Sequence, residues 1–305
     1  MKIFLREMFI YWFLSIIRVI IAVPFFTLFE RKILSYIQIR KGPNKVGFLG
    51  LLQPIADGLK LVFKSFVVPF YSKLSIFFFS PLLSFLIMLL LWYIYIYFYF
   101  GKFYLSIILF LCLSRTQVYT LLGSGWSRNS KYSLLGALRG AAQTISYEVS
   151  LIFILFLPCC FQNSFKINNF FFNYRFYFLL ILLGLIMWVV SCLAETKRSP
   201  FDFAEGEREL VSGFKTEYSA MGFACLFLSE YGRIIFISMF TRLLFFFNNF
   251  FFFIILGKLF GFFFILVRGT LPRFRYDLLM NLLWKGFLPI SIIYLLIVFC
   301  FRNNL

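Results

Sequence analysis

Long runs of apolar residues recur along this chain, and each run is long enough to cross a lipid bilayer. Hydrophobic residues make up 62% of the sequence and charged residues only 14%. One spanning helix needs about 20 apolar residues, and backbone polar groups within lipid must be satisfied inside their own segment. We therefore predict an all-α polytopic membrane protein, a single transmembrane domain over residues 1–305. About eight transmembrane helices are expected, at roughly 8–29, 75–100, 103–122, 138–160, 174–194, 218–241, 247–267 and 284–301.

Lysine and arginine are distributed unevenly about these spans. One side of the predicted membrane carries 19 of them and the opposite side, which includes both termini, carries 7. Basic residues next to spans stay on the cytoplasmic-equivalent side. We therefore predict that the connections at about 30–74, 123–137, 195–217 and 268–283 face inside, with both termini outside. The net charge of +18 then reflects membrane topology and does not indicate nucleic-acid binding.

Half of the twelve acidic residues gather in one polar segment, Ala194–Tyr218, which lies between two apolar runs. These acids are Glu195, Asp202, Glu205, Glu207, Glu209 and Glu217. Glu148 and Glu230 lie inside neighbouring apolar runs, where an ionisable group faces protein or water rather than lipid. Clustered carboxylates raise one another's pKa, which is typical of a proton relay. The alternatives are a solvated, charge-neutralised loop and, for Glu148, a structural partner for an arginine.

The beginning of this polar segment has the pattern of a helix start. Ser199 would be the N-cap, Pro200 the first helical residue and Asp202 the third. The resulting short helix would place Asp202, Glu205 and Glu209 on one face.

The connection after the first span contains a turn followed by an amphipathic pattern. Gly and Pro residues at 41–47 predict the turn. From Leu51 to Phe66 the apolar residues share one helical face, while Asp57, Lys60 and Lys64 share the other. This pattern predicts an interfacial amphipathic helix, lying in the membrane plane. The helix either anchors the chain or frames a lateral opening for a lipid-soluble ligand.

Histidine is absent, and the cysteines are not spaced as metal ligands. A chain without histidine cannot supply His-ligated haem, copper or catalytic zinc. The six cysteines lie in apolar runs without CxxC spacing, which excludes the usual iron–sulfur frameworks. Any redox centre near this chain must therefore be carried by other subunits, and no metal site is expected here.

Four segments of the chain carry a family resemblance: ERKILSYIQIRKGPNKVGFLGLLQPIADGLKL, LLGALRGAAQTISYEVSL, AETKRSPFDFAEGERELVSGFKTEYSAMGF and PRFRYDLLMNLLWKGFLP. With these segments, the chain resembles the family of NADH–ubiquinone oxidoreductase chain 1, the heel subunit of the membrane arm of respiratory complex I. The segments occur in family order and the match extends over essentially the full length, although the intervening spans match only in being apolar.

The resemblance implies a subunit of the H⁺-translocating NADH:ubiquinone reductase with no redox centre of its own. It implies that ubiquinone, the substrate, enters from the bilayer through a chamber at Glu30, Arg31, Gln38, Phe214, Phe223, Arg273, Arg275 and Asp277. It also implies a proton relay towards the membrane arm at Glu148, Glu195, Asp202, Glu205, Glu207, Glu209, Glu217 and Glu230.

The family also implies partners and a location. Hydrophilic quinone-module subunits would dock at the inside face, antiporter-like membrane subunits would lie laterally, and FMN and iron–sulfur clusters would be on partner subunits only. The location would be the mitochondrial inner membrane. The 49 phenylalanines agree with an AT-biased organelle genome.

The chain departs from the family pattern by additional cations. Lys197 and Lys215 stand where the family more often has Asn, and Arg208 where it has a small polar residue. Arg233 follows Glu230 at i+3, a spacing that predicts a contact between them. These four cations are possible modulators of the acidic residues, because they would favour the ionised form of the carboxylates.

Two other classes of protein share parts of this pattern. A stand-alone ion-coupled secondary transporter would use the acids for coupling, but it predicts internal repeats or broken helices, and the sequence has no self-similar halves. The equivalent subunit of a membrane-bound hydrogenase would have the same fold and different partners.

Overall fold

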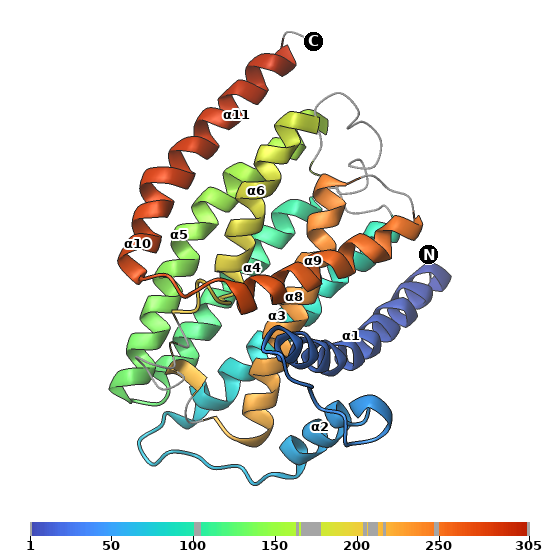
Figure 1. Cartoon of the computed structure of the whole chain (residues 1–305), viewed down its shortest axis with the longest axis vertical. Helices are drawn as coiled ribbons and strands as arrows, with labels where there is room; N and C mark the ends of the chain where they lie inside the picture. Colours follow the sequence, from blue (N-terminus) through green and yellow to red (C-terminus); the bar gives the residue numbers. More distant parts are fainter. Residues whose placement is uncertain are drawn as a thin grey trace.

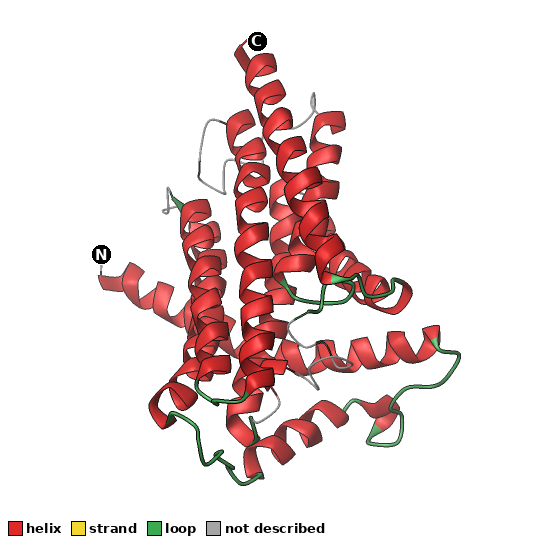
Figure 2. Ribbon diagram, turned by 90° about the vertical axis from the view of Figure 1, so that its left-hand side faces the viewer, coloured by secondary structure: helices red, strands yellow, loops and turns green. Residues whose placement is uncertain are grey.

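A computed structural model describes residues 2–100, 105–162, 165, 178–203, 206, 213–215, 218–246 and 250–303. Side chains are described at 10–94, 105–160, 165, 182–203, 206, 213, 215, 218–246 and 255–300. The described part is helical and contains no strand (Figure 1, Figure 2). Its α-helices are α1 (Lys2–Ile37), α2 (Gln53–Phe63), α3 (Leu74–Phe100), α4 (Ser106–Trp126), α5 (Lys131–Gln162), α6 (Phe178–Glu195), α8 (Ala220–Phe245), α9 (Phe250–Thr270), α10 (Tyr276–Asn281) and α11 (Leu288–Asn303). Shorter 3₁₀ turns are η1 (Phe48–Gly50) and η4 (Gly213–Lys215), and η5 (Leu282–Phe287) is a π-helix.

The all-α polytopic prediction is confirmed. Within the described residues, six helices are long and apolar enough to cross a membrane: Ile10–Ile37, Leu74–Ile94, Ser106–Trp126, Lys131–Cys160, Ala220–Phe245 and Tyr276–Cys300. The remaining two predicted spans, 174–194 and 247–267, fall on α6 and α9, in which some side chains are not described. Several helices extend into the predicted connections. The largest difference is at α1, which continues to Ile37 instead of ending near residue 29.

The first and the last helix run in different directions. Figure 2 shows α1, which begins at the N-terminus, and α11, which ends at the C-terminus, lying across rather than along one another. A helix of 36 residues is about 54 Å long, well beyond the thickness of a bilayer core. Strong tilt is one way for such a helix to remain within a membrane. The tilt also brings the C-terminal third of α1 against α8 and α9.

Aromatic side chains form the centre of the bundle. Phe110 of α4 stacks on Phe240 of α8 with ring centroids 4.6 Å apart, and Trp188 of α6 lies 6.0 Å from the same ring. Small residues allow the α4–α5 hairpin to close: a Cβ on Gly125 would lie 2.3 Å from the Cβ of Ala137. Such close approach through small residues is common between membrane helices.

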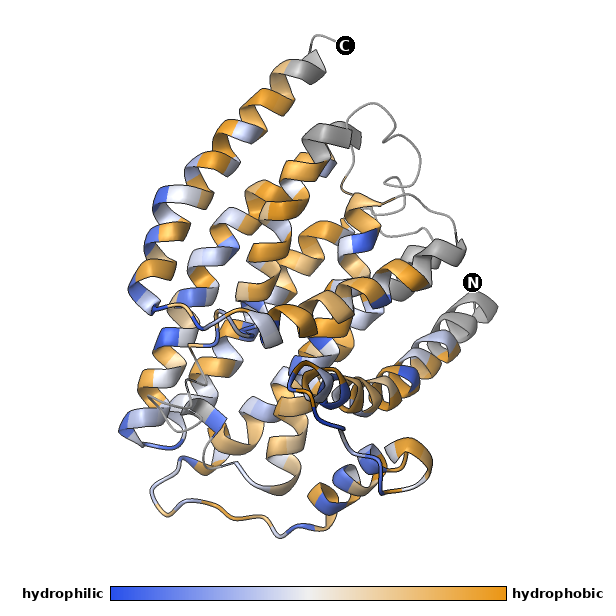
Figure 3. Cartoon of the chain, in the orientation of Figure 1, coloured by the Kyte–Doolittle hydropathy of each residue, from blue (hydrophilic) through white to orange (hydrophobic). Residues whose placement is uncertain are grey.

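The connection between α1 and α3 folds as a turn followed by a short helix. Gly50 has φ +75°, and a Cβ there would lie 2.1 Å from the carbonyl oxygen of Pro43. The helix that follows, α2, exposes its apolar residues Ile55, Leu59, Val62 and Phe63. Figure 3 shows this helix with distinct hydrophilic and hydrophobic sides, so the predicted amphipathic helix is confirmed.

Candidate functional site

Glu30 is buried at the junction of four segments. Its carboxylate is 5% exposed although α1 is otherwise mostly exposed along its length. The hydroxyl of Tyr231 on α8 donates to Glu30 Oε2 at 2.6 Å. Arg268 on α9 donates to Oε1, and Arg198, in the connection after α6, lies 3.6 Å from the same oxygen. We call Glu30, Arg198, Tyr231 and Arg268 the Glu30 cluster.

The geometry of this cluster explains how a carboxylate is tolerated at such depth. Two guanidinium groups and one hydroxyl satisfy both oxygens of Glu30, as a buried charge requires. Arg198 also stacks over the Tyr231 ring, 4.3 Å from its centroid, a cation–π contact. The cluster therefore fastens α1, α8, α9 and the polar segment to one another.

Among the described residues, three further acids lie inside the helical bundle, and each faces a cation on a different element. We call Glu148, Glu195 and Glu230 the acid chain. Arg115 of α4 lies 3.5 Å from Glu148 of α5. Arg233 of α8 lies 3.9 Å from Glu195 at the end of α6, and Lys215 of η4 pairs with Glu230 of α8. Glu148 is buried on α5.

The predicted contact between Arg233 and Glu230 within α8 is not formed. Arg233 Nη2 donates to the backbone oxygen of Glu195 at 2.8 Å, and Nη1 donates to the side-chain oxygen of Gln117. The ion pair of Glu230 is instead with Lys215. Helical spacing places Arg233 one turn from Glu230. The guanidinium extends instead towards α4 and α6, where it donates to two acceptors.

A small polar cavity adjoins this part of the acid chain. It has a volume of about 20 Å³ and is lined by Ser84, Gln117, Thr120, Leu121, Thr196, Lys197, Leu226, Ser229, Glu230 and Arg233. A cavity of this size with several polar partners accommodates one water molecule. Glu230 and Arg233 thus face one hydratable space inside an otherwise apolar bundle.

The predicted helix beginning at Ser199 is wrong over its described residues. The chain from Ser199 to Phe203 forms turns, with the Phe201 amide donating to the carbonyl of Arg198 at 2.8 Å. Phe201 and Phe203 are each 5% exposed and pack against Phe274 and Tyr276. Burial of these rings outweighs the local capping preference, which is worth only about 1 kcal/mol.

Asp202, the third residue of that predicted helix, points towards the connection between α9 and α10 instead. Its Oδ2 lies 3.3 Å from Arg273 Nη2, and the Phe274 amide donates to the carbonyl of Pro200 at 3.0 Å. This connects the polar segment to the connection between α9 and α10.

The remaining predicted chamber residues occupy separate surroundings. Arg31 points away from the Glu30 cluster and pairs with Asp57 of α2 at 2.7 Å. Gln38 is exposed and accepts a 2.9 Å hydrogen bond from Arg40. Arg275 and Asp277 pair with each other at the surface, 3.1 Å apart. Phe223 stacks on Phe227, which in turn lies 4.4 Å from the Tyr231 ring, so aromatic rings lead along α8 to the Glu30 cluster.

Several predicted site residues lie outside the described part of the chain. They are Glu205, Glu207, Arg208, Glu209, Glu217 and the side chain of Phe214. Lys197 is described and lines the polar cavity.

Five residues of these clusters were not among the predicted site residues. They are Arg115, Gln117, Arg198, Tyr231 and Arg268. A signal existed for Arg115, because an arginine in the middle of an apolar run requires a polar partner as much as Glu148 does. For Arg198 and Arg268, nothing local in the sequence distinguishes them from the neighbouring basic residues.

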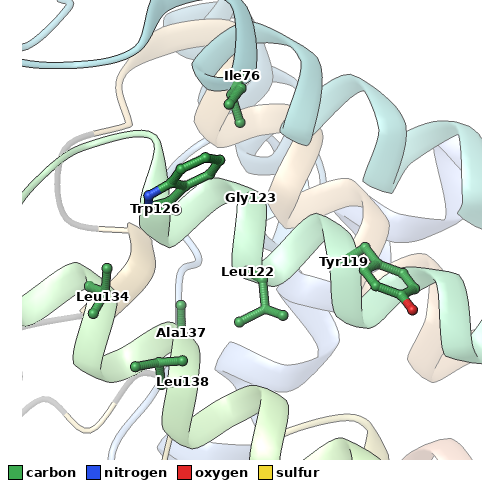
Figure 4. A pocket seen from close by; sticks show the side chains of 8 residues that line it. All are labelled: Ile76, Tyr119, Leu122, Gly123, Trp126, Leu134, Ala137 and Leu138. Carbon is green, nitrogen blue, oxygen red and sulfur yellow. The ribbon is translucent and has the colours of Figure 1, made fainter.

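Apolar cavities open between the helices, and two of them are lined by described residues. One of about 410 Å³ lies among α3, α4 and α5, where Figure 4 shows Trp126 and Leu122 of α4 near Leu134, Ala137 and Leu138 of α5. The other, of about 170 Å³, lies between α3 and α8, next to the segment that follows α2, and is lined by Phe66, Phe77, Phe78, Pro81, Leu82, Met221, Gly222 and Cys225. The second cavity is close to Phe223, which packs against the cluster of Phe77, Tyr218 and Leu226.

Comparisons with known proteins agree on one family. The NADH dehydrogenase family matches residues 10–299. The chain is 50% identical over 292 residues to the NADH-ubiquinone oxidoreductase chain 1 of Aedes aegypti, covering 92% of each chain. It is 51% identical over 288 residues to that of Anopheles gambiae, covering 92% of this chain and 91% of the relative. With that of Heterololigo bleekeri it shares 46% identity over 303 residues, covering 95% and 96%.

Proposed function

This chain belongs to the NADH dehydrogenase family, and we propose that it is the membrane subunit of NADH:ubiquinone oxidoreductase that admits ubiquinone and begins a carboxylate proton relay. It is a multi-pass helical protein and a subunit of this enzyme, with other complex I subunits as its partners. The finer assignments below rest on the geometry of the described residues.

The acid chain is the single observation that carries the relay. Glu148, Glu195 and Glu230 lie inside an apolar bundle, each opposite a cation from a different element. Ionisable groups at this depth are costly and usually serve ion or proton transfer. Asp202 would join this chain to the inside connections, and Glu205, Glu207, Glu209 and Glu217 would extend it.

The Glu30 cluster and the neighbouring aromatic residues support the quinone chamber. A lipid-soluble quinone needs an apolar passage from the bilayer with a few polar groups at its end. The 170 Å³ apolar cavity beside α2, and the aromatic row Phe223–Phe227–Tyr231 that ends at Glu30, have this character. Arg31, Gln38, Phe214, Arg273, Arg275 and Asp277 would line the inside mouth of the chamber.

The proposed mechanism couples the two sites through charge. Reduction of ubiquinone, with electrons from iron–sulfur clusters on partner subunits, would change the charge near the Glu30 cluster. The acid chain would then respond by moving protons towards the antiporter-like subunits. The shared polar segment, which supplies Arg198 to the Glu30 cluster and Glu195 and Lys215 to the acid chain, provides a physical connection.

The placement in the cell follows from the family and the charge asymmetry. We propose a single transmembrane domain in the mitochondrial inner membrane, with both termini on the intermembrane-space side and membrane lipid around it. The inside connections would then meet the hydrophilic quinone-module subunits, which would carry FMN and the iron–sulfur clusters.

A neutral substitution in the acid chain tests this function. Glu148→Gln in the assembled enzyme should reduce the number of protons translocated per NADH oxidised, and Lys131→Gln, an exposed residue outside both clusters, serves as the matched control. Migration of this chain in a large NADH-oxidising assembly on a native gel is required as well. Full proton stoichiometry in a normally assembled Glu148→Gln enzyme would refute the role of that residue.

A further inference from the structure

Arg233 closes the end of α6 from a neighbouring helix. The last carbonyls of a helix lack intrahelical partners and carry partial negative charge. After α6, the amides of Thr196, Lys197 and Arg198 return to the carbonyls of Cys192, Ala194 and Leu193. The carbonyl of Glu195 instead accepts a 2.8 Å hydrogen bond from Arg233 Nη2, so the guanidinium completes the cap.

The second anchor of Arg233 is also uncharged. Its Nη1 donates to the side-chain oxygen of Gln117 on α4. The guanidinium is therefore fixed by two neutral acceptors, and the nearest carboxylate oxygen is that of Glu195 at 3.9 Å. The guanidinium is thus held in place without forming a bidentate ion pair with a carboxylate.

Glu195 is the acid that depends most on such a charge. Its side chain and that of Arg233 are each 5% exposed, and among the described residues none donates a hydrogen bond to its carboxylate. Burial and the negative end of α6 both disfavour a carboxylate here. By contrast, Arg115, the cation opposite Glu148, is 64% exposed.

Other ionisable groups lie on the elements that pack around Glu195 and Arg233. They are Glu148 of α5, Arg115 of α4, Cys192 of α6, Lys197 after α6, Glu230 of α8 and Lys215 of η4. Glu148 and Glu230 each have their own cation. Lys197 also acts on Glu195 electrostatically, but Arg233 has the larger effect and is the cation whose ion pair with Glu195, at 3.9 Å, is found among the described residues.

We propose that Arg233 is a positioning residue of the acid chain, which caps α6 through the carbonyl of Glu195 and favours the ionised form of the Glu195 carboxylate. This inference rests on the proposed relay role of Glu195. It adds to that role a residue, Arg233, that controls whether Glu195 is ionised but does not itself carry a relayed proton.

The test removes the charge while keeping a hydrogen-bonding side chain. In the assembled enzyme, Arg233→Gln should move the acidic limb of the pH profile of NADH-driven proton translocation to higher pH by about one unit, because a nearby cation favours the charged form of a carboxylate. Arg233→Lys keeps the charge and should leave the limb in place. Gln117→Met removes a neutral anchor, keeps the charge, and should leave it in place as well.

A double variant separates this inference from the relay itself. Adding Arg233→Gln to a Glu195→Gln enzyme should cause no further shift. The proposal would be overturned if the acidic limb of the pH profile lay at the same pH in the Arg233→Gln and parent enzymes. It would also be overturned if this limb moved equally in the Arg233→Gln and Arg233→Lys enzymes. Full proton stoichiometry in Glu195→Gln alone would instead refute the relay role of Glu195.

Assembly of the enzyme, measured on a native gel, provides a second readout. Where Arg233→Gln fails to assemble on a native gel, the double variant decides, because an unpaired buried charge is destabilising whereas a neutral pair is tolerated. Restored assembly in Arg233→Gln/Glu195→Gln supports the charge pairing, and failure to restore it contradicts the proposal.

Discussion

The hydroxyl of Tyr231 donates a 2.6 Å hydrogen bond to Glu30, although the two residues are 201 positions apart in the sequence. This contact fixes the tilted helix α1 to α8 at the point where Arg198 and Arg268 also reach the same carboxylate. Hydrogen bonds to a buried charge are stronger than those between neutral groups. Polar contacts at Glu30 thus add to the apolar packing of α1, in which Val19, Val23 and Phe26 contact the core.

Removing the Tyr231 hydroxyl should weaken this junction. We expect Tyr231→Phe to cost about 1.5–3 kcal/mol, since it deletes one hydrogen bond to a charged acceptor. Thermal inactivation of ubiquinone reduction should occur at a lower temperature, while NADH oxidation by a water-soluble artificial acceptor should be unchanged.

Tyr294→Phe is the matched control for this prediction. Tyr294 is buried on α11, and its hydroxyl has no hydrogen-bond partner among the described residues. Loss of that hydroxyl should be neutral or slightly stabilising. Equal thermal inactivation of the two variants would show that the Tyr231–Glu30 contact contributes nothing to stability.

The pair Asp202–Arg273 connects the polar segment to the connection between α9 and α10, and we expect it to shape the mouth of the proposed quinone chamber. The two side chains are 3.3 Å apart and only partly exposed. Asp202→Asn and Arg273→Gln should each raise the KM for a short-chain ubiquinone, and the double variant should be no worse than either single variant. The coupling energy should be about 1 kcal/mol, as for other partly solvated pairs. Strictly additive effects on KM would indicate that the pair does not act as a unit.

The sequence was sufficient for the elements whose signals are local. Apolar runs predicted the spanning helices, and the period of polar and apolar residues predicted α2. The start of the polar segment shows where local signals fail. Ser199, Pro200 and Asp202 have the pattern of a helix start, but burial of Phe201 against Phe274, a residue more than 70 positions away, decides the conformation.

The partners of the buried charges could not be predicted for the same reason. Arg198, Arg268 and Arg273 look alike in the sequence, as basic residues flanking spans. Only the packing of α1 against α8 and α9 distinguishes the two that reach Glu30 from the one that pairs with Asp202. For Arg233 the local signal is misleading. Helical spacing predicts a contact with Glu230, whereas the side chain donates hydrogen bonds to α4 and α6.

Gly50 should be intolerant of substitution, whereas Gly58 should not. At Gly50 an alanine would have to adopt φ near +75° with its Cβ 2.1 Å from the Pro43 carbonyl oxygen, so Gly50→Ala must displace the connection between α1 and α2. Gly58 lies in α2 with nothing within 4 Å of an added Cβ, and alanine there should stabilise the helix by about 0.5–1 kcal/mol. Limited proteolysis of assembled enzyme should show faster cleavage of the connection in Gly50→Ala only. Equal cleavage of both variants would mean that the turn at Gly50 is not required.

The pair Lys215–Glu230 allows structural and functional roles to be separated. Both side chains are largely buried, at 11% and 18% exposure, so Lys215→Glu should place two like charges together and reduce the amount of assembled enzyme on a native gel. The exchange Lys215→Glu/Glu230→Lys restores opposite charges and should recover assembly. It should not recover proton translocation, because a lysine at position 230 cannot replace a carboxylate in the acid chain. Recovery of both properties would show that Glu230 serves only as a structural counter-charge, and recovery of neither would show that the orientation of the pair is itself required for packing.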